Sequence, residues 1–174
     1  MPGSDELLNA TIAAATHELD SALARIKHCL DQLTEAHVWH RPGEGQNSIA
    51  NLLLHLAGNL RQWIIVGLGG GHDNRDRPRE FNASEGPPKD ELLRLLEETV
   101  REVKETLAHQ TAADLIRVRR IQGFDVTGLA AIFDSIPHFR GHTQEIVFRT
   151  RLLLGDTYRF AWQPTTKEQG AALD

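Results

Sequence analysis

The sequence predicts an all-α protein, a four-helix bundle, and three observations support this fold class. Apolar residues recur every three or four positions through four long segments, which is the period of an amphipathic α-helix. Stretches rich in glycine and proline separate these segments, as turns and loops do. The chain has 174 residues, of which 40% are apolar and 25% charged. This length and composition suit a globular domain that needs no disulfide to hold its core.

The first predicted helix runs from about Asp5 to Leu33 and has no glycine or proline in its interior. Its apolar side chains form a single stripe, made of Leu8, Ile12, Ala15, Leu19, Leu23, Ile26, Leu30 and Leu33. Residues 41–46, which include one proline and two glycines, interrupt the helical pattern. We therefore expect a long amphipathic helix followed by a turn.

The second predicted helix begins near Asn47 or Ser48, because both residue types are favourable N-caps. Its apolar stripe contains Ile49, Leu53, Leu56, Leu60 and Ile64, and the glycines from Gly67 onwards end it. Residues 69–88 are polar and rich in glycine and proline, which predicts a long loop. Loops of this length tend to be functional or mobile.

The third predicted helix begins at Lys89 or Asp90, and its apolar stripe contains Leu92, Leu96, Val100, Val103 and Leu107. Residues 111–126 are less regular and predict a short extended piece around Val118. The fourth helix is expected from about Thr127 to Leu154. Pro137 lies inside it and should kink it or remove one backbone hydrogen bond.

Gly155 is expected to end the fourth helix, and a C-terminal segment follows. Tyr158, Phe160 and Trp162 alternate there, which predicts an extended segment with its rings against the bundle. We expect one domain over residues 1–174, with its core over about 5–163 and a tail over 164–174. The long loop and the irregular segment leave room for a crossover connection, so an up-and-down topology does not follow.

Composition and charge argue against several classes of partner. The net charge of −5 argues against a nucleic-acid or lipid-headgroup surface. Residues 1–6 lack the pattern of a signal peptide, and no apolar run approaches the roughly 20 residues of a membrane span. The single cysteine, Cys29, rules out an intrachain disulfide and is expected to be a small buried hydrophobe. We expect a cytoplasmic protein that contacts neither nucleic acid nor membrane.

His138 and His142 are the most informative of the nine histidines. Four residues turn a helix by about 400°, so the two imidazoles leave one face about one turn apart and can share a cation. Gly141 between them has no side chain to crowd that cation. The alternative is a solvated helix face that carries two surface histidines.

His55 lies on a polar line of the second predicted helix. If this line faces the polar line of the fourth helix, three imidazoles converge, and three protein ligands with one open position are typical of catalytic zinc. Imidazole also suits nickel, copper and iron. Four polar residues are candidates for orienting the rings, or else are ordinary surface: Asn51, Asn59, Asp134 and Glu145. The other six histidines are expected at the surface or in hydrogen bonds.

Two segments resemble the DinB/YfiT-like superfamily. Residues 47–60, which carry His55, are similar to its second helix, and residues 136–151 are similar to its later metal-binding helix. The resemblance covers about residues 5–163. Within the superfamily, the chain is most similar to an uncharacterised branch whose sequences share the stretch Ile121–Val126 and the tail Tyr158–Trp162.

This resemblance implies a four-helix bundle that holds a divalent metal, typically zinc or nickel, through His55, His138 and His142. It also implies a homodimer, and apolar Phe148 and Leu152 outside the main stripe of the fourth helix point the same way. Some members of the superfamily are S-transferases or isomerases that use a low-molecular-weight thiol such as bacillithiol or mycothiol.

Our leading hypothesis is a metal-dependent enzyme that transfers a thiol to small electrophiles or acts as a hydrolase. Glu145 is the candidate general base if it reaches the cleft, and no catalytic residue is otherwise assigned. The first alternative is a non-catalytic module that binds a metal or small ligand in a stress response. The second is a structural bundle in which the histidines are incidental.

Overall fold

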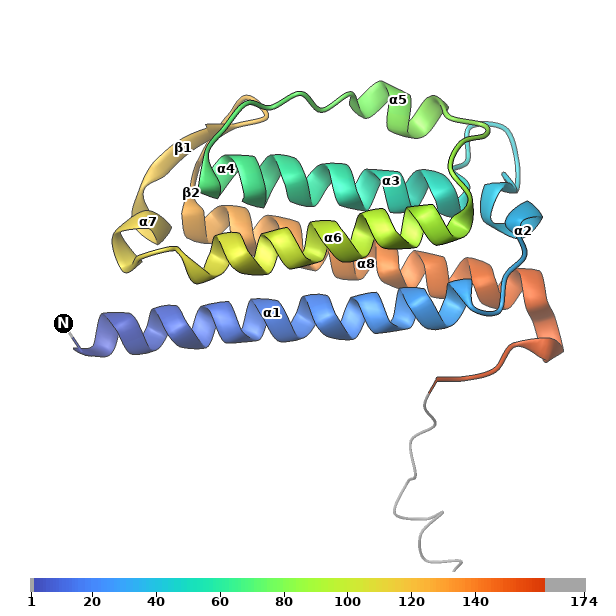
Figure 1. Ribbon diagram of the computed structural model, residues 1–174, viewed down its shortest axis with the longest axis horizontal. Helices are drawn as coiled ribbons and strands as arrows, with labels where there is room; N and C mark the ends of the chain where they lie inside the picture. The colour runs from blue at the N-terminus through green and yellow to red at the C-terminus, as the bar shows by residue number, and fades with distance from the viewer. Residues whose placement is uncertain (1, 162–174) are drawn as a thin grey trace, which may run out of the picture.

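The computed structural model describes residues 2–161 and has the predicted bundle of four long helices (Figure 1). These helices are α1 (Pro2–Leu30), α3 (Ile49–Leu60), α6 (Lys89–Ala108) and α8 (Gly128–Leu154). The predictions for Trp162 and for the tail over 164–174 fall outside the described residues. No helix in the described part of the chain is both long and apolar enough to cross a membrane.

The bundle contains the crossover for which the sequence leaves room. α1 packs against α6 and α8, and α3 packs against the same two helices, so α1 and α3 lie at opposite corners. Figure 1 shows α3 and α6 running in one direction and α1 and α8 in the other. Because α3 and α6 are parallel, the chain between them returns along the whole length of the bundle.

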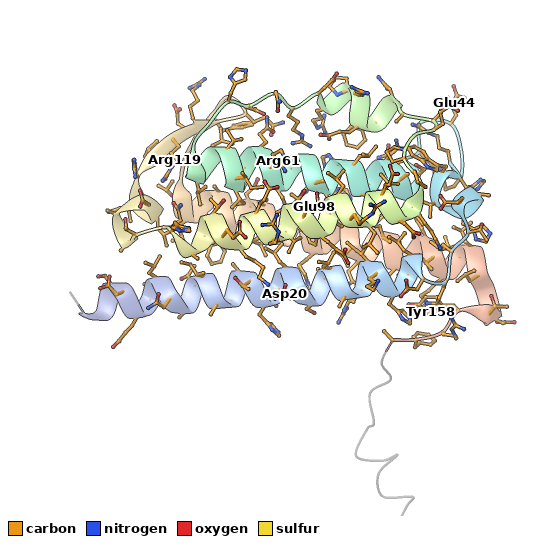
Figure 2. The ribbon with its side chains drawn as sticks, viewed as in Figure 1. Asp20, Glu44, Arg61, Glu98, Arg119 and Tyr158 are labelled. Atoms are coloured by element: carbon orange, nitrogen blue, oxygen red, sulfur yellow. The ribbon has the colours of Figure 1, made fainter. Side chains whose placement is uncertain are left out.

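The bundle closes over an apolar core to which all four long helices contribute. Its largest fully buried side chains include Leu19, Ile26, Leu53, Leu56, Leu96 and Phe139. Ion pairs span the outer edges of the interfaces, where Lys104 of α6 meets Asp20 of α1 at 2.9 Å and Arg61 meets Glu102 of α6 at 3.0 Å. Figure 2 labels Asp20 and Arg61, one member of each pair. Such exposed pairs add little stability, so the apolar stripes hold the bundle together.

α1 ends at Leu30, three residues before the predicted end at Leu33. The chain then forms the short helix α2 (Glu35–Trp39), which was not predicted from the sequence. Thr34 caps α2 by accepting a hydrogen bond from the backbone N–H of His37, and the His37 ring bonds back to Thr34. This local capping competes with continuation of α1.

α3 begins after Ser48 as predicted, and Ser48 and Asn51 form a capping box. The helical segment then continues past Leu60 as a π-helical turn, η1 (Arg61–Val66), and a last turn, α4 (Gly67–Gly69). π-Helical turns occur often at functional sites. Gly70 and Gly71 end the segment with φ angles of 88° and 112°.

The predicted loop over 69–88 contains a helix, α5 (Arg77–Asn82), which lies over α3 (Figure 1). Asp76 caps it by accepting a hydrogen bond from the backbone N–H of Arg79. Asn51 of α3 holds this segment down, since its Nδ2 donates to the carbonyls of Glu80 and Ala83, both at 2.8 Å. The crossover is therefore attached directly to the helix that carries His55.

The irregular segment before α8 is a helix and a hairpin rather than one extended piece. α7 (Ala112–Ile116) leads into antiparallel strands β1 (Val118–Ile121) and β2 (Phe124–Thr127). Gln122 and Gly123 make the turn with φ angles of 51° and 86°, as a two-residue hairpin turn requires. A lone β-hairpin is marginal in water, so its packing on the bundle explains why sequence alone did not reveal it.

α8 matches the predicted fourth helix and remains helical through Pro137. Thr127 caps its start by accepting from the backbone N–H of Ala130, and Gly155 ends it with a φ of 52°. A single turn, η2 (Gly155–Thr157), follows. The ring of Tyr158 then lies edge-on against His28 of α1, with centroids 6.2 Å apart, which confirms that this part of the C-terminal segment packs on the bundle.

Candidate metal centre

The structure brings His55, His138 and His142 together between α3 and α8. One ring nitrogen of each histidine lies within 4.8 Å of the corresponding nitrogen of the others. The Nε2 atoms of His55 and His138 are 2.9 Å apart, and the three ring centroids are 4.6 to 5.2 Å apart. His55 is buried and the other two are half-buried. The polar lines of the two helices therefore face each other.

The donor set fits a divalent metal ion. Two nitrogens bound tetrahedrally to one zinc ion at about 2.0–2.1 Å lie about 3.3 Å apart, and this spacing lies between the 2.9 Å from His55 to His138 and the 4.8 Å limit for all three. Within residues 2–161 this is the one group of three or more metal-ligating side chains so arranged. Metal ligation by these three histidines stays a prediction, and we call them the histidine triad below.

Glu80 of α5 orients the first member of the triad. Its Oε2 lies 3.1 Å from Nδ1 of His55. Nη2 of Arg75 lies 3.0 Å from the same nitrogen. A metal on Nε2 requires the proton on Nδ1, and in that tautomer the Glu80 carboxylate accepts it. Burial raises the pKa of Glu80, but hydrogen bonds from Arg75 and His55 outweigh burial and hold this pKa below its ordinary value.

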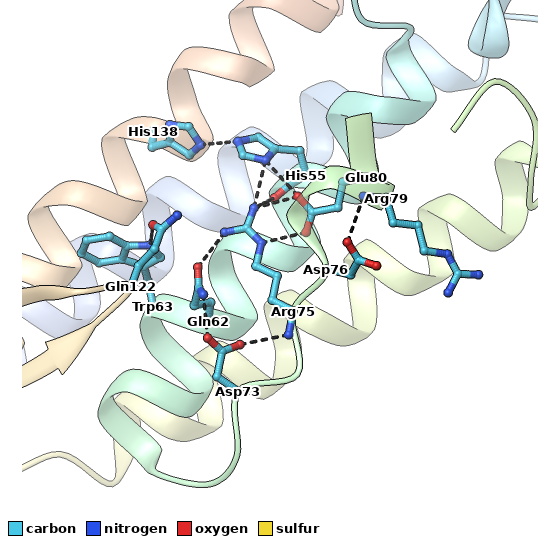
Figure 3. A network of polar contacts seen from close by, with 10 residues as sticks. All are labelled: His55, Gln62, Trp63, Asp73, Arg75, Asp76, Arg79, Glu80, Gln122 and His138. Atoms are coloured by element: carbon cyan, nitrogen blue, oxygen red, sulfur yellow. Dashed lines mark hydrogen bonds and ion pairs between the residues drawn. The ribbon is translucent and has the colours of Figure 1, made fainter. Parts of the chain in front are cut away.

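Arg75 holds Glu80 in place through two nearly parallel hydrogen bonds (Figure 3). Its Nε donates to Oε1 at 2.7 Å and its Nη2 to Oε2 at 2.8 Å, and the two side chains are 6% and 11% exposed. Arg75 Nη1 also donates to Gln62 Oε1 at 2.9 Å, and Gln62 Nε2 donates to Asp73 at 2.6 Å. Buried bidentate pairs of this kind fix geometry tightly.

Gly58 makes room for this ion pair. A Cβ atom at position 58 would lie 2.0 Å from Oε1 of Glu80 and 2.9 Å from Nε of Arg75. Any side chain on this face of α3, one turn after His55, would displace the carboxylate. The requirement at this position is thus close approach rather than an unusual backbone angle.

Glu145 orients the third member of the triad. Its Oε2 lies 2.8 Å from Nδ1 of His142, while its Oε1 accepts hydrogen bonds from Arg149 at 2.8 and 3.0 Å. Burial raises the pKa of Glu145, but the bonds from His142 and Arg149 hold this pKa below its ordinary value. Because both oxygens are engaged, the structure favours an orienting role over that of general base.

The other residues considered for orienting the rings do something else. Asn51 caps α3 and anchors the crossover. Asn59 accepts a hydrogen bond from Ser135 at 2.8 Å, which ties α3 to α8 beside the triad. Within the described chain, Asp134 makes no hydrogen bond or ion pair. Glu80 and Arg75 were not predicted from the sequence, although Asp76 followed by Pro78 is a recognisable signal for a helix start in their loop.

The remaining histidines agree with the simpler expectation. His28 bonds the carbonyl of Arg159 at 2.6 Å, His37 completes the cap of α2, and His109 bonds the carbonyl of Glu105 at 2.7 Å. The other three, His17, His40 and His72, are exposed. Cys29 is fully buried in the core, as predicted.

His138 is held in its neutral form, which is the form that binds metal. Burial is the main cause, followed by the neighbouring His142 and His55 and the guanidinium groups of Arg75 and Arg77, and together they lower the pKa of His138 to about 4. An imidazole that stays neutral over most of the pH range keeps its lone pair available for a metal ion.

This pKa predicts that the metal-free protein loses stability as the pH falls from about 6.5 towards 4. Unfolded His138 takes up a proton near its ordinary pKa, whereas folded His138 does not, so protons favour the unfolded state in this window. Urea midpoints measured with chelator present at pH 7, 6 and 5 test it. The fall should be smaller in His138→Ala and unchanged in His17→Ala. An equal fall in all three proteins would contradict this account.

The fold and the triad define a class of protein: a DinB-like helical bundle with a candidate histidine metal site. A structure search finds a conserved protein from Enterococcus faecalis at 21% identity and a TM-score of 0.71, covering 83% of this chain and 97% of that chain. DinB-like proteins from Bacillus cereus and Bacillus subtilis match at 15% and 17% identity, with TM-scores of 0.65 and 0.63. They cover 83% and 87% of this chain and 91% and 99% of their own. At these identities the likeness establishes the fold.

The family follows from the sequence itself. A family model described as a protein of unknown function, DUF1572, matches residues 7–166. The chain therefore belongs to the DUF1572 family, and it shares the fold of DinB-like proteins. A search of curated proteins finds no match.

Proposed function

We propose that this protein is a divalent-metal-dependent enzyme that acts on small molecules at the histidine triad. The observation that carries the proposal is the convergence of three ring nitrogens within 4.8 Å, with a carboxylate on Nδ1 of both His55 and His142. Three imidazoles leave a coordination position open, as in catalytic rather than structural zinc sites. A bound zinc or nickel ion supplies Lewis-acid activation there and lowers the pKa of a water or thiol ligand.

The reaction that we propose is transfer of a low-molecular-weight thiol to a small electrophile, with hydrolysis as the second choice. The chain's own residues contribute orientation. Glu80 and Glu145 each hold Nδ1 of a ring, His55 and His142, which leaves the Nε2 atoms of both rings available to a metal ion, and burial keeps His138 neutral. A preformed, partly buried site of this kind can hold a thiolate beside an electrophile and so gain from proximity.

Cobalt substitution combined with turnover assays tests the proposal. Cobalt-loaded protein should change its visible absorption when cysteine or another small thiol is titrated in, because thiolate enters the open position. Metal-dependent consumption of thiol should follow across a panel of small electrophiles. An unchanged spectrum without any thiol consumption would favour the alternative, a module that binds metal or ligand without turnover.

We also propose that the protein is a homodimer. Phe148 and Leu152 of α8 are 60% and 67% exposed, and apolar side chains exposed along one helix indicate a packing partner. Sedimentation at micromolar concentration should give twice the chain mass of 19.4 kDa. Leu152→Glu should shift the population towards the single-chain mass. Wild-type protein that sediments at the single-chain mass alone would overturn this proposal.

A further inference from the structure

An open hollow, called the cavity below, lies at the surface where the hairpin meets η1 and the start of α8. Its volume is about 610 Å³, within the range of small-molecule sites. β2, the first turns of α8 and η1 surround it. Its walls are mostly apolar and come from Trp63, Phe124, Val126, Ala130 and Phe133, with the carboxylates of Asp125 and Asp134 at the edge.

The cavity lies near the triad along α8 and along the helical segment that continues α3. Asp134 precedes His138 by one turn, which places it about 6 Å along the axis of α8. Trp63 of η1 follows His55 of α3 by about two turns, or roughly 12 Å, along the helical segment that runs antiparallel to α8. Between these levels the hydrogen bond from Ser135 to Asn59, 2.8 Å long, joins the two helices. A molecule in the cavity therefore lies within one to two helical turns of the triad.

The hairpin side of the cavity is fixed in position. Nε1 of Trp63 donates to Oε1 of Gln122 at 3.1 Å, and Gln122 lies at the hairpin turn (Figure 3). The side chain of Ile121 is buried against Gly67, where a Cβ atom would lie 2.6 Å from it. The stretch Ile121–Val126, which the metal site does not use, thus serves to place Phe124 and Val126 opposite α8.

The charges around the cavity select the ligand. Asp125 is paired with Arg120 at 3.1 Å, whereas Asp134 has neither an ion pair nor a hydrogen bond within residues 2–161. A carboxylate without a partner at the edge of an apolar cavity favours an amine or another hydrogen-bond donor on the ligand.

We propose that this cavity binds the apolar body of the substrate, a small aromatic or alkyl amine whose reactive end reaches the histidine triad. This inference rests on the proposed function, since it assigns the substrate class of that same site. Trp63, Phe124 and Val126 bury the ring or alkyl chain, and Asp134 binds the amine. The cavity thus sets specificity, and the triad sets the chemistry.

Titration of the zinc-loaded protein with benzylamine and benzoate tests this assignment. The indole N–H resonance of Trp63 should shift with benzylamine, whereas that of Trp39, bound to the carbonyl of Pro87, should stay fixed. Benzylamine should bind at least about fivefold more tightly than benzoate, and Asp134→Asn should remove this preference. A fixed Trp63 resonance, or a preference that survives Asp134→Asn, would overturn the proposal.

A matched pair of phenylalanines provides the control. Phe124 and Phe160 are 61% and 53% exposed, but Phe124 alone of the two lines the cavity. Phe124→Ser should weaken benzylamine binding about fivefold, and Phe160→Ser should leave it unchanged. Equal weakening in both variants would show that benzylamine binds nonspecifically and would overturn the proposal.

Cobalt distinguishes failure of this inference from failure of the proposed function. Paramagnetic cobalt at the triad should broaden the ring-proton resonances of bound benzylamine more than zinc does. If metal is bound but cobalt leaves these resonances unchanged, the cavity does not serve the triad and the inference is overturned. If the protein binds no metal while benzylamine still shifts Trp63, the proposed function fails and the ligand assignment of the cavity stands.

Discussion

Replacing His138 with alanine is expected to abolish stoichiometric metal binding while leaving the helical content nearly unchanged. The substitution leaves two of three predicted nitrogen ligands, and we expect a loss well beyond the roughly 10–100-fold that follows removal of an outer hydrogen-bond partner. Because His138 is half-buried and is not part of the apolar core, the helices should keep their packing. Metal content by mass spectrometry and far-ultraviolet circular dichroism measure the two effects.

His142→Ala should behave in the same way, since its ring occupies the same cluster one turn later. His109→Ala is the matched control, because His109 bonds a backbone carbonyl at the end of α6 and should not affect metal content. Full metal content in both His138→Ala and His142→Ala would overturn the triad as the metal site and the proposed function with it.

Glu80→Gln is expected to lower metal affinity by about 10–100-fold. The amide cannot carry the negative charge that favours the His55 Nδ1 proton, and it cannot accept from Arg75 at both atoms as the carboxylate does. The change also leaves the Arg75 guanidinium buried without its counter-charge, so the metal-free protein should lose stability too. Competition with a fluorescent zinc chelator and urea denaturation report the two quantities.

Gly58→Ala tests the ion pair between Arg75 and Glu80 by changing α3 instead of the crossover. A methyl group at position 58 would occupy the position of the Glu80 carboxylate. Alanine raises intrinsic helix propensity by about 1 kcal/mol over glycine, so a simple helix position would gain stability. We expect lower stability and weaker metal binding instead. Glu85→Gln, an exposed change in the same connection, is the control. A stabilised Gly58→Ala protein with wild-type affinity would contradict the role assigned to Glu80.

The long helices were predictable because each must bury one continuous apolar stripe, which the sequence shows directly. Ser48 and Thr127 mark their starts as predicted, because capping depends on neighbouring residues. α5 was missed because none of its residues is buried, so it lacks an apolar stripe. Its position depends on Asn51 and Gly58 of another helix, which local sequence does not reveal.

In the candidate site, too, residues on one helix could be predicted from the sequence, whereas residues brought in by the tertiary fold could not. His138 and His142 were found because a spacing of four within one helix fixes their geometry before any tertiary contact forms. Glu145 was found as a neighbour for the same reason, and the structure corrects its role by engaging both its oxygens. Glu80 lies 25 residues from His55 across a loop, so only the folded crossover brings the two together.

The crossover connection is longer than its path requires. The helical segment from Ile49 to Gly69 is about 30 Å long, whereas residues 70–88 could extend to about 60 Å. The excess chain allows a helix to form halfway and lets Arg75 and Glu80 reach inward to His55. A connection of about half this length would still join the parallel helices α3 and α6. It would be fully extended, however, and could not bring the Glu80 carboxylate to His55. In this topology, the extra residues of the connection supply the side chains that surround His55.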